Sequence, residues 1–148
     1  MTDGSTPDGR GGAAAAEPRR PVVLAVEDEP LNRRLVHAIL EPEGYRVHDA
    51  VTLAEAREWL RHEHPDIILL DLRLPDGDGL ILARELKADP RRFMIPIIAA
   101  TASALSPVPE AAVAAGCDGF LIKPIRPAEL VAEVARQLAR VRTADAAS

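Results

Sequence analysis

Short runs of apolar residues alternate with amphipathic stretches between residues 21 and 141. Apolar runs bounded by turn signals are typical of strands that are buried on both faces of a parallel sheet. The predicted strands are Val22–Val26, Tyr45–Asp49, Ile67–Leu70, Ile97–Ala100 and, more weakly, Phe120–Ile122.

Helical periodicity fills the segments between these strands. Pro30 suits a first helical turn and has apolar residues at helical spacing behind it. Thr52 and Glu55 form a capping box before the next helix. The remaining helices are predicted over residues 78–88, 110–115 and 127–141. Strand–helix units repeated in this way favour an α/β fold, with helices on both faces of a parallel sheet and right-handed crossovers.

The two ends of the chain lack this pattern. Residues 1–20 are rich in Gly, Pro and Ala and have no large apolar residue after Met1, so they are expected to form a disordered N-terminal extension. Residues 142–148 are expected to be a flexible tail. The folded domain is therefore predicted to span residues 21–141.

Composition excludes several classes of protein. The 148-residue chain has a net charge of −5, which disfavours nonspecific nucleic-acid binding. No apolar run is long enough to cross a membrane. Cys117, the single cysteine, forms no intramolecular disulfide and indicates a reducing cytoplasm. The abundance of Ala, Arg and Pro hints at a bacterial source.

Polar residues follow the predicted strands directly. Glu27 and Asp28 follow the first strand, Asp71 the third, Thr101 the fourth and Lys123 the fifth. In a parallel sheet these ends meet at one edge. Clustered carboxylates need a neutralising cation, and Mg2+ prefers such oxygen ligands. A carboxylate acceptor with a hydroxyl, an ammonium group and a divalent cation suits phosphoryl transfer.

Each of these residues also has a structural interpretation when taken alone. Asp28 suits a helix N-cap, Asp71 a turn and Thr101 a cap or a strand end. Lys123 would be a solvated charge, yet the chain has only two lysines against 16 arginines. The occurrence of all these residues at strand ends favours the functional interpretation.

Four motifs resemble those of response-regulator receiver domains of the CheY-like family. They are Val-Glu-Asp-Glu at 26–29, Leu-Leu-Asp-Leu-Arg-Leu-Pro-Asp-Gly-Asp-Gly at 69–79, Ala-Ala-Thr-Ala at 99–102 and Gly-Phe-Leu-Ile-Lys-Pro-Ile at 119–125. The resemblance covers residues 21–141. It implies a flavodoxin-like, three-layer (βα)5 fold with parallel sheet order 2-1-3-4-5.

The resemblance also implies a metal site and an acceptor. Asp71 is implied as the phosphoacceptor, and Asp28, Asp71 and the backbone carbonyl of Arg73 as Mg2+ ligands. Glu27 is implied to act on the ion through a water molecule.

Further positions are implied to respond to the phosphoryl group. Lys123 contacts it, Thr101 turns toward it and Phe120, the switch residue, turns inward behind Thr101. The side chains of Arg73 and Ser103 lie where receivers tune hydrolysis of the phosphoaspartate. The Lys123–Pro124 peptide bond is implied to be cis.

The implied function is that of a stand-alone, single-domain response regulator in a two-component system or phosphorelay. It accepts a phosphoryl group from a histidine kinase or histidine phosphotransfer protein and signals to an unidentified protein through helix 4, strand 5 and helix 5. It is not an enzyme beyond its own phosphorylation and dephosphorylation. One alternative is an interaction module that is not phosphorylated. Another is a haloacid-dehalogenase-like phosphatase, although Arg73 stands where that class has a second Asp.

Four features depart from the receiver pattern or lie outside the motifs. Pro107 and Pro109 predict a late, short or mobile fourth helix, and the alternative is a longer loop before Glu110. Asp89–Phe93 forms a lengthened loop in which Arg91 and Arg92 are expected to be a solvated pair. Cys117 is expected to be a small buried residue, and His62 and His64 lack the partners of a metal pair.

Overall fold

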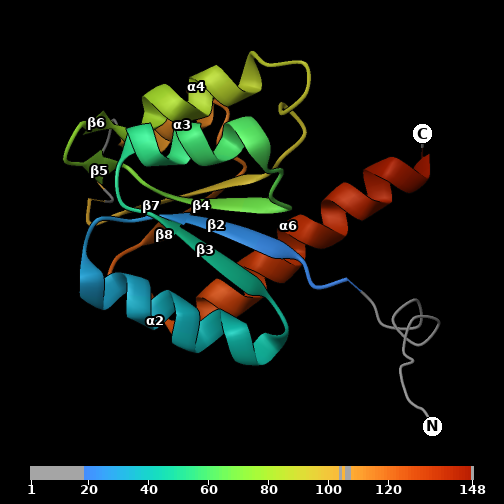
Figure 1. Ribbon diagram of the computed structural model, residues 1–148, viewed down its shortest axis with the longest axis horizontal. Coiled ribbons are helices and arrows are strands. Elements are labelled where there is room, and N and C mark those ends of the chain that lie inside the picture. Colours follow the sequence, from blue (N-terminus) through green and yellow to red (C-terminus); the bar gives the residue numbers. More distant parts are fainter. Residues whose placement is uncertain (1–18, 104, 106–107, 148) are drawn as a thin grey trace, which may run out of the picture.

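A computed structural model of the chain describes residues 19–103, 105 and 108–147. Its centre is a five-stranded parallel sheet (Figure 1). The strands are β2 (Val22–Val26), β3 (Arg46–Ala50), β4 (Ile67–Asp71), β7 (Ile97–Thr101) and β8 (Gly119–Ile122). They lie in the order β3-β2-β4-β7-β8, which is 2-1-3-4-5 counted along the chain and confirms the predicted topology.

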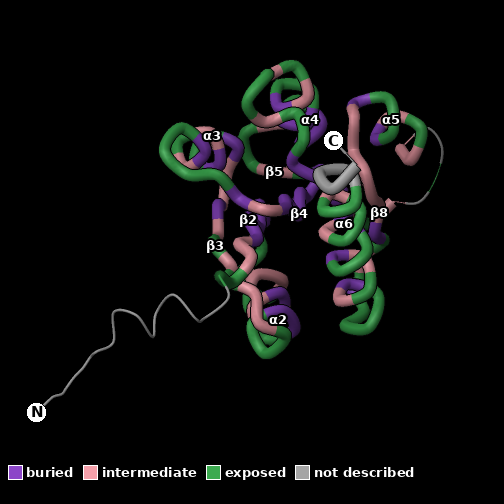
Figure 2. The backbone as a smooth tube through the Cα atoms, turned by 90° about the vertical axis from the view of Figure 1, so that its right-hand side faces the viewer, coloured by how far each residue is buried: buried purple, intermediate pink, exposed green. Residues whose placement is uncertain are grey.

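Helices cover both faces of the sheet, so the molecule has three layers (Figures 1 and 2). The helices are α2 (Pro30–Leu40), α3 (Leu53–His62), α4 (Gly79–Lys87), α5 (Val108–Ala114) and α6 (Pro127–Ala147), with a 3-10 turn at Glu41–Glu43. Helices α3, α4 and α5 pack on one face, and α2 and α6 pack on the other. In the described part of the chain, no helix has the length and apolar character that a bilayer crossing requires.

The core follows the two-residue period of the strands. Within β2, Leu24 and Val26 face the α3–α4–α5 layer, whereas Val23 and Ala25 face the α2–α6 layer. The strand is apolar throughout because both faces of a central parallel strand are buried. This explains why the runs are continuous rather than alternating in the sequence.

The predicted helix starts are largely confirmed. The Thr52 hydroxyl accepts a hydrogen bond from Glu55 N (3.0 Å), and the Glu55 carboxylate accepts one from Val51 N (2.8 Å). Helix α5 begins at Val108, two residues before its predicted start at residue 110, and it spans seven residues, so it is short as predicted. Pro109 fits in its first turn, where a missing N–H costs no helical hydrogen bond.

The last helix is longer than predicted. Helix α6 continues to Ala147, so residues 142–147 are helical and the expected helix end at residue 141 is wrong. The segment has no Gly or Pro, and its alanines and Arg142 are good helix formers. The Thr143 hydroxyl donates to Ala139 O (2.9 Å), which satisfies it within the helix. The predicted disordered extension lies outside the described residues, apart from Arg19 and Arg20.

A short antiparallel hairpin was not predicted. Strands β5 (Arg73–Leu74) and β6 (Gly77–Asp78) follow β4 directly. Two-residue strands are too short to show a hydrophobic period, so the sequence indicated only a turn. The Asp76 carboxylate at the tip of the hairpin accepts hydrogen bonds from Leu53 N (2.9 Å) and Ala54 N (3.1 Å). The hairpin is thereby fixed to the first turn of α3.

Candidate functional site

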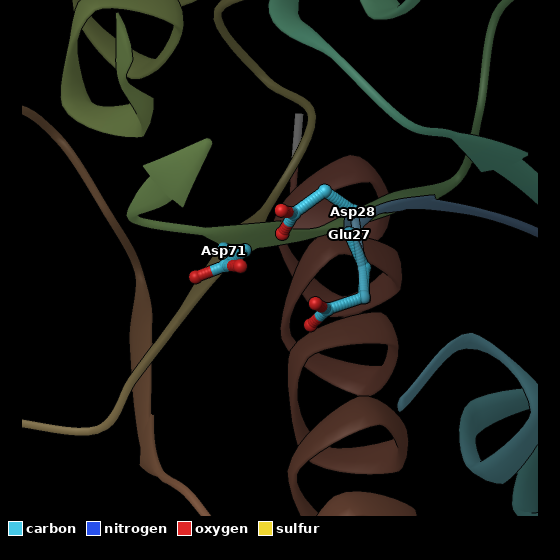
Figure 3. Close-up of side chains that lie close together, drawn as sticks. All are labelled: Glu27, Asp28 and Asp71. Atoms are coloured by element: carbon cyan, nitrogen blue, oxygen red, sulfur yellow. The ribbon is translucent and has the colours of Figure 1, made fainter. Parts of the chain in front are cut away.

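Three carboxylates meet at the carboxyl edge of the sheet. Glu27 and Asp28 follow β2, and Asp71 is the last residue of the neighbouring strand β4. One carboxylate oxygen from each residue lies within 4.8 Å of the others, and Figure 3 shows the three groups gathered together. The parallel register of β2 and β4 therefore brings together residues that are more than 40 positions apart in sequence.

Lys123 lies directly after β8 and joins two of these carboxylates. Its Nζ is 2.8 Å from Glu27 Oε1 and 3.2 Å from Asp71 Oδ2, and the side chain is 17% exposed. Burial lowers the pKa of Lys123, but the hydrogen bond to Glu27 and the charges of Asp71 and Glu27 outweigh burial, so the net pKa is raised. Lys123 is therefore a fixed positive charge.

The Asp71 carboxylate is buried but retains access to a cleft. Burial raises the pKa of Asp71, and the hydrogen bond from Arg73 N to Oδ1 (3.1 Å) and the charge of Lys123 oppose that rise. This hydrogen bond, from a backbone amide two residues on, agrees with the interpretation of Asp71 as a turn residue. The cleft has a volume of about 400 Å³, and its lining is Glu27, Asp28, Glu29, Asp71, Arg73, Thr101, Ala102, Ser103 and Lys123.

Thr101 lines the cleft, and Phe120 lies on the neighbouring strand. Thr101 ends β7, and its hydroxyl accepts a hydrogen bond from Ser103 N (3.3 Å). This contact agrees with the structural interpretation of Thr101 as a strand-end residue. Phe120 on β8 pairs in register with Ala99 and packs half-buried against the α3–α4–α5 side of the core. The Lys123–Pro124 peptide bond is cis, as the resemblance implied.

Two predicted structural roles are corrected. The N-cap of α2 is Glu29, whose carboxylate accepts Leu31 N (3.3 Å), and not Asp28. Arg92 is not solvated, since its side chain is 12% exposed and bonds the Leu60 carbonyl and the Asp89 carboxylate. Leu60 lies in the last turn of α3, where a carbonyl has no helical partner and a cation is favourable.

Two residues that shape the site were given no role from the sequence, although Gly79 ends the receiver-like motif at 69–79. Arg33 on α2 donates from Nη1 to the carbonyls of Glu27 (3.2 Å) and Asp28 (2.8 Å). Gly79, the first residue of α4, lies against the Asp71 main chain, and an added Cβ would be 2.3 Å from Asp71 O. Neither residue type indicates such a role by itself, because a surface-like Arg and a turn-like Gly are common at such positions.

The donor set fits a hard divalent cation. All three clustered side chains offer carboxylate oxygens, which Mg2+ prefers, and the ammonium of Lys123 stands beside them as a charge and not as a ligand. Two other candidate groups lie outside the cluster. His62 pairs with Glu58 (3.3 Å), and burial raises the pKa of the half-buried Cys117 thiol to about 11.

Known proteins are similar to this chain in sequence. A family model described as the response regulator receiver domain matches residues 23–135. The chain is 38% identical over 103 residues to the polar-differentiation response regulator DivK of Brucella ovis, covering 70% of this chain and 84% of that protein.

Solved structures show the same likeness. The receiver domain of sensor histidine kinase PA1611 from Pseudomonas aeruginosa is 36% identical, with a TM-score of 0.75, 82% of this chain covered and 99% of that one; it holds a magnesium ion in its active site cleft. A CheY-like response regulator receiver domain protein from Methanospirillum hungatei is 26% identical, with a TM-score of 0.79 and coverage of 84% and 98%.

Proposed function

We propose that this chain, which belongs to the response regulator receiver domain family and acts in two-component signalling, accepts a phosphoryl group on Asp71. One observation carries the proposal. The Asp71 carboxylate opens into a cleft where Lys123 and the carboxylates of Glu27 and Asp28 surround it. An acceptor oxygen, a fixed cation and spare carboxylates for a metal are the groups that phosphoryl transfer to an aspartate requires.

The carboxylates of Asp28 and Asp71 and the backbone carbonyl of Arg73 are the proposed Mg2+ ligands, and Glu27 acts through water. The magnesium ion in the P. aeruginosa receiver supports this assignment, as does the donor set itself. When bound, the ion neutralises the carboxylates and stabilises negative charge on the phosphoryl oxygens.

The proposed donor is a phosphohistidine on a histidine kinase or histidine phosphotransfer protein. An Asp71 carboxylate oxygen forms a bond to phosphorus in line with the breaking P–N bond, and the imidazole leaves with that electron pair. Lys123 then transfers a hydrogen bond from the carboxylate to a phosphoryl oxygen. The buried Lys123–Asp71 contact supports this role, because the ammonium already lies beside the reacting group.

The proposed output starts at Thr101. Its hydroxyl leaves the Ser103 amide and donates to a phosphoryl oxygen, and Phe120 moves into the space behind it. The adjacent face of α5, β8 and α6 then changes shape and is read by a protein target. Phe120 lies on β8, which pairs with the strand that carries Thr101, and this supports the proposed coupling between the movements of Thr101 and Phe120.

Receiver domains are signalling proteins rather than classical enzymes. The proposal therefore includes no turnover beyond formation and loss of the protein's own acyl phosphate. A cytoplasmic location is part of the same proposal, and the single cysteine, which excludes an intramolecular disulfide, supports it.

Labelling with a small phosphodonor tests the proposal. Incubation with acetyl phosphate and Mg2+ is expected to add one phosphoryl group to the wild type, measured by intact mass. Asp71→Asn is expected to stay unlabelled, whereas Asp89→Asn, which alters a loop aspartate outside the site, is expected to label normally. Wild-type labelling of Asp71→Asn would refute the assignment.

A further inference from the structure

Arg33 contacts the acidic cluster through the main chain. It lies in the first turns of α2, three residues after Pro30, and is partly buried. One guanidinium nitrogen, Nη1, donates both to Glu27 O (3.2 Å) and to Asp28 O (2.8 Å). These are the carbonyls of the two residues that bring carboxylates to the cleft from β2.

Those carbonyls belong to a junction between two regular elements. Strand β2 ends at Val26, and the first backbone hydrogen bond of α2 runs from Arg33 N to Glu29 O (3.0 Å). Pro30 has no N–H to offer to the preceding carbonyls. The Arg33 side chain thus supplies the donor that neither the sheet nor the helix provides at Glu27 and Asp28.

The charge of Arg33 acts differently from that of Lys123. Lys123 contacts the carboxylates of Glu27 and Asp71 and so competes with any cation for their oxygens. The Arg33 hydrogen bonds at this junction end on carbonyl oxygens. A positive charge placed behind the main chain opposes carboxylate repulsion without occupying a carboxylate oxygen.

We propose that Arg33 is a positioning residue for the divalent cation: it fixes the Glu27–Asp28 main chain so that both carboxylates keep their spacing to Asp71. The inference rests on the proposed function, since it concerns the same metal site. Groups that hold metal ligands in place commonly set metal affinity by about 10–100-fold.

Magnesium titration of the metal-free protein by calorimetry tests the inference. Arg33→Gln is expected to weaken Mg2+ binding by about tenfold. Arg34→Gln, which removes an exposed arginine from the next position of the same helix, is expected to bind Mg2+ as the wild type does. Arg33→Lys keeps the positive charge but loses the planar guanidinium group and its several N–H donors, so an intermediate Mg2+ affinity is expected.

Phosphorylation supplies a second readout. Arg33→Gln is expected to need about ten times more Mg2+ for half-maximal labelling by acetyl phosphate, while the rate at saturating Mg2+ stays close to that of the wild type. A structural defect alone would lower the rate at every Mg2+ concentration.

Hydrogen exchange gives a readout without metal. The Glu29 amide donates to Glu27 Oε2 (3.0 Å), and its exchange is expected to accelerate in Arg33→Gln but not in Arg34→Gln. If Arg33→Gln does not fold, the Mg2+ affinity of Arg33→Lys decides. Wild-type Mg2+ affinity in the folded Arg33 variant would overturn the inference, whereas a wild type that binds no Mg2+ would overturn the proposed function itself.

Discussion

At the scale of single residues, both lysines of this arginine-rich chain occupy positions where one ammonium meets several acceptors. Lys123 reaches Glu27 and Asp71, and Lys87 Nζ reaches Phe93 O (3.0 Å), Ile95 O (3.1 Å) and Asp118 Oδ2 (3.1 Å). A compact ammonium with rotatable donors serves acceptors in different directions, which a planar guanidinium does not. The contrast in usage indicated Lys123 from sequence, and the same signal was present for Lys87.

Arg92 and Arg91 give a matched pair for testing what burial does to an arginine. Arg92→Gln is expected to lower the free energy of unfolding by about 1–2 kcal/mol, because the Leu60 carbonyl and Asp89 lose their partner. Arg91→Gln alters an exposed side chain and is expected to change stability by less than about 0.5 kcal/mol. Urea unfolding of both variants measures the difference, and equal effects would mean that the Arg92 contacts contribute nothing.

Gly79 concerns the fit of a helix start against the acceptor residue. Alanine is the better helix former, yet Gly79→Ala places a Cβ against Asp71 O, so a loss of about 1–3 kcal/mol is expected. Labelling of Asp71 by acetyl phosphate is expected to fall as well, because the main chain of the acceptor must shift.

Gly44→Ala is the control for this glycine. Gly44 has φ of +96° and open space around it, so its replacement costs backbone strain of about 1–2 kcal/mol and leaves labelling unchanged. Normal labelling and stability in Gly79→Ala would show that the close approach to Asp71 is dispensable.

At the scale of elements, α2 is joined to the edge strand β3 by a histidine between two carboxylates. His37 Nδ1 is 2.8 Å from Glu41 Oε2, and Nε2 is 3.0 Å from both carboxylate oxygens of Asp49 on β3. Burial lowers the pKa of His37, but hydrogen bonds to Glu41 and Asp49 outweigh it, and the net pKa is raised above 6.5. The protonated imidazole therefore links the two elements.

This link predicts a pH-dependent contribution to stability. Because the folded-state pKa of His37 is raised, the contribution is complete below the ordinary value of 6.5 and is lost as pH rises through the folded-state pKa. The free energy of unfolding of the wild type is expected to exceed that of His37→Gln by about 0.5–1 kcal/mol near pH 6, and this difference is expected to shrink as the pH rises. Urea unfolding across this range measures it, and an excess that grows with pH would contradict the account.

Elements were predictable from sequence to the extent that burial repeats along them. Continuous apolar runs marked β2, β4 and β7 because these strands are buried on both faces. The edge strand β3 is mostly exposed or half-buried and has a weaker apolar pattern. Thr52 and Glu55 marked the start of α3. The β5–β6 hairpin was not predictable, since four residues carry no period. The continuation of α6 past residue 141 was missed because residues 142–147 include no large apolar residue that would extend the helical pattern.

At the scale of the whole molecule, the site is a product of sheet topology. Glu27 and Lys123 are 96 positions apart in sequence and 2.8 Å apart in space. Strand-end chemistry and the motifs of the receiver family predicted which residues meet there. The supporting roles of Arg33 and Gly79 were not predicted. Arg33 contacts carbonyls, and Gly79, although it ends a quoted motif, acts by lacking a side chain, so the residue types alone do not indicate these roles.

The central claim is that one carboxylate, that of Asp71, is the acceptor of the phosphoryl group. Peptide mapping by mass spectrometry, after incubation with Mg2+ and acetyl phosphate and reduction of the acyl phosphate with borohydride, locates the modified residue directly. We expect the borohydride-reduced residue to be found at position 71, and we expect this conversion of Asp71 to disappear when Mg2+ is chelated. Conversion at another aspartate, or at Asp71 to the same extent without Mg2+, would contradict it.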